Sequence, residues 1–103
     1  MKKDFSKIDN QEEFVETVAR DCIEHLSEKD KQCFRDNRDP YDYHMGYGMY
    51  IRNHYIHGKK LGFICLMADD LSHEIIVRII EILNPGWEFR GESIHETKIR
   101  EKP

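Results

Sequence analysis

The sequence predicts a mainly α-helical protein, a compact bundle of about four helices with a short extended C-terminal segment. Two observations support this prediction. Apolar residues recur at spacings of three and four in several stretches, which is the period of a helix with one buried face. Residues that cap or end helices lie at the edges of these stretches. A chain of 103 residues has the length of one domain, so we expect residues 1–103 to form a single helical domain.

Two helices are predicted in the first third of the chain. Asn10 is a suitable N-cap, and Glu13 three residues later completes a capping box. Ser27 repeats the cap signal with Asp30 behind it, which predicts a second, short helix through about Phe34. The apolar stripe of the first helix comprises Phe14 or Val15, Val18, Ala19, Cys22, Ile23 and Leu26.

A central helix is predicted from Pro40 to His57, with Gly58 as its C-cap. At about 100° per residue, this helix has two opposite faces. One face mixes apolar groups with a small residue, as a packing face does, and the other is both aromatic and polar, as a binding face can be. The packing face holds Tyr41, His44, Met45, Gly48, Ile51, Arg52 and Tyr55, and the opposite face holds Tyr43, Tyr47, Tyr50, His54 and His57.

The last predicted helix is strongly apolar. Asp69, Asp70 and Ser72 lie at its start, where negative charge complements the positive end of the helix dipole. Asn84, Pro85 and Gly86 end it. Its buried stripe comprises Leu71, Ile75, Ile76, Ile79, Ile82 and Leu83.

The segments that flank these helices carry weaker signals. Residues 1–9 are charged and are expected to be loose. Residues 61–67 are apolar but too few to distinguish a strand from a buried loop or helix, so no element is assigned to them. Trp87 and Phe89 are expected to dock on the core in extended form, and residues 91–103 to form a weakly held tail.

Composition narrows the classes of function. A formal net charge of −4 argues against nucleic acid as a partner, because non-specific binding needs a basic surface. No apolar run reaches the length of a signal peptide core or a membrane span, so we expect a soluble, cytoplasmic protein without membrane contact. Three cysteines without a Cys-x-x-Cys pair suit reduced thiols.

The segment from His44 to Tyr55 resembles the signature of a family of short, uncharacterised bacterial proteins. That signature reads His-x-Gly-x-Gly, two residues, Ile-Arg-Asn, one residue, then Trp or Tyr. The family's second motif, Asp-Asp-hydrophobic-Ser, is matched by residues 69–72. The resemblance covers roughly residues 40–83 and implies a small helical domain with no established activity. The family often continues with a tryptophan-rich turn, which this chain replaces with Ile56-His57-Gly58.

Arg52 lies near the centre of the predicted packing face, where an unpaired guanidinium would be costly to bury. We expect it to form a structural ion pair with Asp69 or Asp70, the carboxylates at the start of the last helix. The alternative is that Arg52 faces a cleft and binds an anionic ligand.

Arg52-Asn53-x-x-x-His57 also resembles the catalytic motif of the HEPN ribonucleases, helical bundles that usually dimerise to build their site. The resemblance implies that His57 would act as general acid or base and Arg52 would stabilise phosphate charge, without a metal. On one uninterrupted helix these two side chains would point about 140° apart. The pair therefore requires a helix that ends or distorts before Gly58.

The leading hypothesis is a non-enzymatic module that binds a protein or a second copy of itself. Its binding residues would be Tyr43, Tyr47, Tyr50, His54 and His57, because aromatic groups with polar tips are enriched at interfaces. Coverage of this face by the N-terminal helices is the competing interpretation. A metal-independent HEPN-like ribonuclease and an immunity or inhibitor protein remain as alternatives. His54 and His57 are three residues apart, but spacing alone supplies two ligands at most, so no metal or cofactor is expected.

Overall fold

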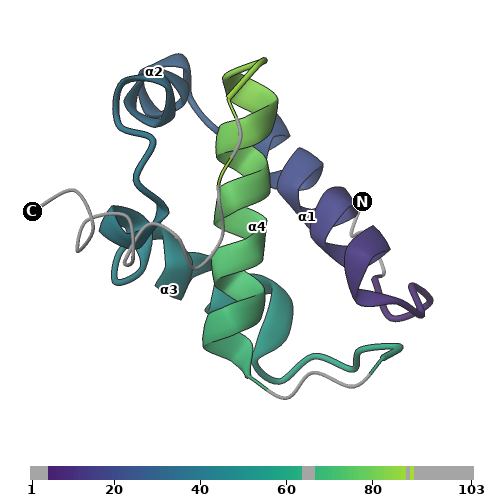
Figure 1. Ribbon diagram of the computed structural model, residues 1–103. Coiled ribbons are helices and arrows are strands. Elements are labelled where there is room, and N and C mark those ends of the chain that lie inside the picture. The colour runs from purple at the N-terminus through teal and green to yellow at the C-terminus, as the bar shows by residue number, and fades with distance from the viewer. Residues whose placement is uncertain (1–4, 64–66, 88, 90–103) are drawn as a thin grey trace, which may run out of the picture.

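The computed structural model describes residues 5–63, 67–87 and 89. The described part of the chain is a compact, all-helical globule with four α-helices and no strand, which confirms the predicted fold class (Figure 1). A short 3₁₀ helix and a π-helical turn flank α3. The elements in chain order are α1 (Gln11–His25), α2 (Glu28–Asp36), η1 (Pro40–Tyr43), α3 (Tyr47–Ile51), η2 (Arg52–Ile56) and α4 (Ala68–Leu83).

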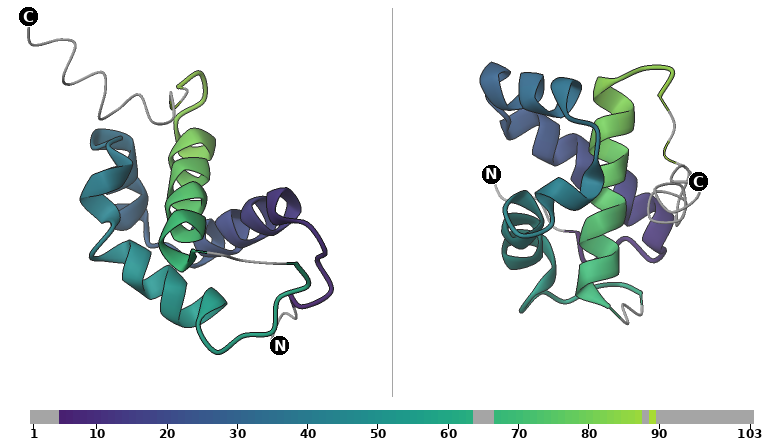
Figure 2. Two further views of the ribbon diagram at one scale, coloured as in Figure 1. Left: turned by 60° about the horizontal axis from the view of Figure 1, so that its bottom comes forward. Right: turned by 60° about the vertical axis from the view of Figure 1, so that its left-hand side comes forward.

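Helix α4 runs through the middle of the molecule. In Figures 1 and 2, α1 crosses it on one side while α2 and α3 lie on the other. Each of the other helical segments contacts α4. This central position follows from composition, because α4 is more apolar than the other two long helices, α1 and α2, and buries residues over most of its length. Its buried residues are Leu71, Ser72, Ile75, Ile76, Ile79 and Ile80.

The predicted helix boundaries at the N-terminal end are confirmed. The Asn10 side chain accepts a 2.7 Å hydrogen bond from the Glu13 backbone N–H, and α1 starts one residue after the cap. Ser27 Oγ accepts a 3.1 Å bond from the Asp30 N–H at the start of α2. Both caps satisfy backbone donors that have no partner within the helix.

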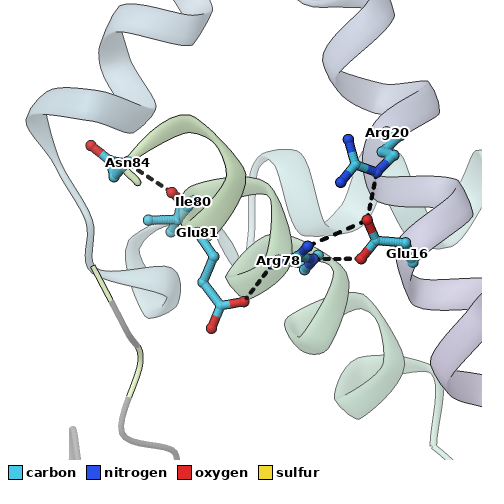
Figure 3. Close-up of polar contacts among 6 residues, drawn as sticks. All are labelled: Glu16, Arg20, Arg78, Ile80, Glu81 and Asn84. Carbon is cyan, nitrogen blue, oxygen red and sulfur yellow. Dashed lines mark hydrogen bonds and ion pairs between the residues drawn. The ribbon is translucent and has the colours of Figure 1, made fainter. Parts of the chain in front are cut away.

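Polar contacts hold α4 against α1 and α2 (Figure 3). Arg78 of α4 donates from Nε and Nη2 to the two carboxylate oxygens of Glu16 in α1, and from Nη1 to Glu81. Hydrogen bonding to Arg78 lowers the pKa of Glu16. Asn84, the C-cap of α4, donates to the carbonyl oxygens of Ile80 at 2.8 Å and Phe34 at 3.2 Å. The end of α4 is thereby fixed to the end of α2.

The prediction of one central helix from residue 40 to 57 is wrong. The 3₁₀ turn η1 is capped by Asp39, and residues 44–46 then form a turn before α3 begins. Gly46 has φ −91° and ψ −89°, which is not a helical conformation, and glycine is a poor helix former. After α3 the backbone widens into η2, where the His57 N–H bonds to the Arg52 carbonyl five residues earlier at 2.7 Å. Gly58, with φ +72°, ends the segment as predicted.

The break changes the predicted packing face. Tyr41 and Met45, expected on that face, have 46% and 71% of their surface exposed. Gly48, Ile51, Arg52 and Tyr55, also assigned to it, are buried. The residues after the turn therefore lie on the buried side as expected, whereas Tyr41 before it and Met45 within it are exposed.

The flanking segments are only partly described. Residues 1–4, 64–66, 88 and 90–103 lie outside the described part, and with them the predicted C-terminal tail. Of the segment expected to be loose, Phe5 and Ile8 pack against the core because both side chains are apolar. Trp87 packs against the core as well. No helix in the described ranges is both long and apolar enough to span a membrane.

Replacing Gly62 with alanine should destabilise the protein, because a Cβ atom there would lie 2.3 Å from the Ile8 carbonyl oxygen and 2.7 Å from that of Ser6. We expect the free energy of unfolding to fall by about 1 to 3 kcal/mol, measured by chemical denaturation followed by circular dichroism. Gly46→Ala is the matched control, since a Cβ there meets nothing within 4 Å. Equal effects of the two substitutions would contradict this role for the Gly62 contact.

Candidate functional site

The predicted tyrosine face does not lie on one surface. Tyr43, in η1, donates from its hydroxyl to the Asn37 carbonyl at 2.7 Å, and Cys33 O lies 3.0 Å from the same hydroxyl. Its ring stacks on Phe34 with 4.4 Å between centroids. Burial raises the pKa of Tyr43 to about 12. These contacts with α2 make Tyr43 part of the architecture.

Tyr47 is the second residue of this face that the N-terminal helices cover. Its ring meets Phe34 edge to face, with 5.6 Å between centroids. Burial, followed by the neighbouring Cys22 thiol of α1, raises the pKa of Tyr47. The interpretation of a covered face therefore holds for Tyr43 and Tyr47.

Tyr50 and His54 form the part of the face that remains at the surface. Both are exposed, and their ring centroids lie 4.0 Å apart. The His54 ring Nδ1 lies 3.0 Å from the Tyr50 carbonyl oxygen, a geometry in which Nδ1–H donates and Nε2 points elsewhere. Tyr50 also stacks on Tyr47 with 5.1 Å between centroids. His57 is exposed beyond the end of η2.

Two methionines extend this exposed region. Met49, beside Tyr50 in α3, has 44% of its surface exposed, and Met45 in the preceding turn has 71%. A single exposed apolar residue is common, but several on one short segment can mark an interaction site. We call Met45, Met49, Tyr50 and His54 the α3 surface. Sequence analysis missed its methionines because it assigned Met45 to the packing face and Met49 to neither face.

A buried hydrogen bond lies beneath the α3 surface. The Tyr55 hydroxyl donates to Asp21 Oδ2 of α1 at 2.6 Å, and both residues are buried. Their neighbour Cys22 is also buried, and burial raises the pKa of its thiol to about 11. The thiol is therefore protonated and unreactive at neutral pH. The only sequence signal for this contact is that Asp21 directly precedes Cys22 of the apolar stripe.

Arg52 is buried in a polar network between η2 and α4. Only 7% of its surface is exposed. Nη1 donates to Ser72 Oγ at 3.0 Å, Nη2 donates to the His44 carbonyl at 3.2 Å, and Nε lies 3.5 Å from Asp69 Oδ1. Ser72 Oγ in turn donates to the Asp69 carbonyl at 3.0 Å. Among the described residues, Asp70 makes no ion pair with Arg52.

Gly48 allows this network to form. A Cβ atom at this position would lie 3.2 Å from Arg52 Nη1 and from the Tyr43 carbonyl oxygen, and 3.4 Å from Ile76 Cδ1. The absence of a side chain lets α3 approach α4 closely while the Arg52 guanidinium passes beside it.

Arg52 and His57, the pair of the ribonuclease hypothesis, are not brought together. Arg52 is directed into the network with Ser72 and Asp69, whereas the His57 side chain is exposed. The two residues share a backbone hydrogen bond, but no side-chain hydrogen bond joins them within the described chain. The π-helical turn supplies the distortion that the hypothesis required. Even with this distortion, the Arg52 guanidinium is bonded to protein atoms and does not face His57.

One group of side chains in the described ranges has the spacing of a metal site. Ligand atoms of Asp21, Glu24 and His25 lie within 4.8 Å of one another on α1. Asp21 accepts the Tyr55 hydrogen bond, and His25 Nδ1 lies 2.8 Å from the Asp21 carbonyl. Asp21 and Glu24 also take part in further interactions. The three side chains thus already have protein partners.

Comparisons with known protein families, curated proteins and solved structures found no match to this chain. The resemblance of residues 40–83 to a family of short bacterial proteins therefore remains a prediction.

Removing the Arg52 guanidinium should destabilise the fold more than removing its carboxylate partner. We expect Arg52→Met to lower the free energy of unfolding by about 1 to 3 kcal/mol, because the His44 carbonyl loses its donor. Asp69→Asn should cost less than about 1 kcal/mol, because 59% of the Asp69 side chain is exposed. Urea denaturation measures both, with Asp70→Asn as the control. A larger loss in Asp69→Asn than in Arg52→Met would contradict this order.

Proposed function

We propose that this chain is a non-enzymatic protein-binding module that docks a partner protein through the α3 surface. The observation that carries the proposal is the exposure of Met45, Met49 and Tyr50 on a segment whose opposite side is buried against α4. Exposed apolar groups gathered in this way are typical of protein interaction sites. A small helical domain of the bacterial cytoplasm is the setting that sequence composition and the family resemblance favour.

The chemistry of the α3 surface suits a protein partner. Methionine is flexible and polarisable, so Met45 and Met49 can adapt to an apolar surface. Tyrosine adds a large rigid ring with a polar tip and is enriched among the residues that dominate binding energy. The Tyr50 ring is held between Tyr47 and His54, which reduces the conformational entropy lost on binding.

The base of the α3 surface is rigid. Tyr55 is bonded to Asp21 of α1, and Arg52 is bonded to Ser72 of α4. The segment that carries Tyr50 is therefore fixed to two other helices. A partner would meet a preformed surface rather than a loop that must first become ordered, as is common for preorganised complexes.

A photo-crosslinking amino acid in place of Met49 should capture the partner. We expect a benzophenone side chain at this position to yield a discrete protein adduct in a lysate of the native host, identified by mass spectrometry. A second copy of the chain would appear as a crosslinked dimer in the purified protein. The same amino acid in place of Lys29, an exposed residue of α2, is the control for non-specific capture.

A charged substitution on the same surface tests specificity. With the crosslinker at Met45, Tyr50→Lys should abolish the adduct, because a lysine cannot replace the aromatic contact. Circular dichroism should show an unchanged fold, since Tyr50 is exposed. Identical adducts from the Met49 and Lys29 positions, or an adduct that survives Tyr50→Lys, would contradict the proposal.

A ribonuclease assay separates this proposal from the enzymatic alternative. We expect wild type and His57→Ala to leave single-stranded RNA uncleaved to the same degree, because the Arg52 guanidinium is engaged with Ser72, His44 and Asp69. Product analysis by gel electrophoresis measures the difference. Cleavage by the wild type that is lost in His57→Ala would support the HEPN-like mechanism instead.

A further inference from the structure

A pocket of about 420 Å³ lies between α1 and α4, on residues that the α3 surface does not include. Its volume is in the range of sites that hold small molecules. Side chains from four separate parts of the chain line it, and the sequence gives no sign that they meet. They are Val15 of α1, Tyr41 of η1, Phe89 near the C-terminal end, and His73, Glu74, Val77, Arg78 and Glu81 of α4.

Three aromatic rings form one wall of this pocket. The ring centroids of Tyr41 and His73 lie 4.8 Å apart, those of His73 and Phe89 5.5 Å, and those of Tyr41 and Phe89 6.5 Å. Burial lowers the pKa of His73, so its ring is neutral at pH 7. The faces of tyrosine and phenylalanine rings attract a cation, and the neutral His73 ring between Tyr41 and Phe89 adds no positive charge that would repel one. Tyr41 is 46% exposed, so this wall is open to a ligand from solution.

The charge of the pocket lining is also suited to a cation. Glu74 and Glu81 outnumber the one guanidinium, Arg78. That guanidinium is neutralised by the carboxylates of Glu16 and Glu81, which Figure 3 shows on either side of it. Glu74 is bonded only to a neutral donor, the Gln11 side-chain amide, at 3.0 Å among the contacts of the described chain. Its negative charge is therefore not cancelled by an ion pair.

A second hollow next to the pocket is also lined by carboxylates. It has a volume of about 590 Å³ and shares Val15, Glu74, Arg78 and Glu81 with the pocket. Its own additions are Gln11, Glu12 and Glu16. A cation approaching along this groove would pass carboxylates before it reached the aromatic wall, which favours its capture over that of an anion.

We propose that this pocket binds a small organic cation with an alkylated ammonium group, seated between the Tyr41, His73 and Phe89 rings and the Glu74 carboxylate. Val15 and Val77 supply the apolar part of the lining, which suits methyl groups on the nitrogen. A primary ammonium is more strongly hydrated and would lose more by entering such a site. The expected ligand is thus a free quaternary ammonium ion, or a protonated tertiary amine, of the size of choline.

Isothermal titration of the full chain with choline tests the proposal, with 3,3-dimethylbutan-1-ol as the uncharged ligand of the same shape. We expect saturable binding of one choline per chain and binding of the alcohol that is weaker by roughly 3- to 30-fold. Trp87 is the one tryptophan of the sequence, and its ring centroid lies 6.2 Å from that of Phe89. Its fluorescence should therefore change on titration with the same midpoint.

Two variants connect the binding to the pocket. Glu74→Gln should weaken choline binding by about fivefold or more while leaving the affinity for the alcohol unchanged. Tyr41→Leu should reduce the preference for choline over the alcohol. Both residues are exposed, so circular dichroism should show an intact fold. Glu28→Gln is the matched control, because Glu28 lies on α2 with 82% of its side chain exposed.

Three outcomes would overturn the proposal. They are the absence of choline binding, equal affinity for choline and the alcohol, and an effect of Glu74→Gln no larger than that of Glu28→Gln. A tripeptide that contains trimethyl-lysine is titrated as a further ligand for comparison with choline. If it bound at least tenfold more tightly than choline, the ligand would be a modified protein rather than a free amine, and the assignment to a small molecule would be wrong.

Discussion

Burial of the isoleucine-rich face of α4 is the constraint on which the rest of the structure depends. Ile75, Ile76, Ile79 and Ile80 are withdrawn from water almost completely, and the apolar face they form is too wide for one neighbouring helix to cover. Helices α1, α2 and α3 therefore all pack around α4. Each contributes apolar side chains to this centre. The two proposed sites therefore lie where α3 faces away from α4 and where α1 and α4 meet.

A polar contact, in addition to the burial of Ile51, fixes the position of α3 on this centre. Arg52 has only 7% of its surface exposed, so its guanidinium needs hydrogen-bond acceptors, and Ser72 and the His44 carbonyl provide them. Gly48 makes the approach sterically possible. Any other placement of α3 would leave the buried guanidinium without these acceptors, which would cost free energy. The result is a short helix held in one orientation, with Tyr50 on its outer side.

The sequence predicted the elements whose signals are local. The caps at Asn10 and Ser27 depend on neighbours within three residues, and the apolar period of α4 depends only on its own residues. The break at Gly46 was not predictable in this way. Glycine weakens the helix at this point, but the contact that accompanies the break joins the Tyr43 hydroxyl to carbonyl groups at the end of α2, which no local pattern shows. The Tyr55–Asp21 bond was missed for the same reason, since it joins residues from distant parts of the chain.

The break in the central helix also explains why helical faces predicted Tyr50 and His54 of the α3 surface but not Met45, and did not predict the α1–α4 pocket. In a continuous helix, Tyr41 would share a face with Ile51 and would be buried. The turn at residues 44–46 instead places the Tyr41 ring against His73 at the surface of α4, and it leaves Met45 exposed beside α3. One local departure from helical geometry therefore supplies an aromatic ring to the α1–α4 pocket and an apolar side chain to the α3 surface. Because the two sites depend on the same turn, a substitution that straightened it would be expected to alter both, whereas Glu74 and Tyr50 can each be changed alone.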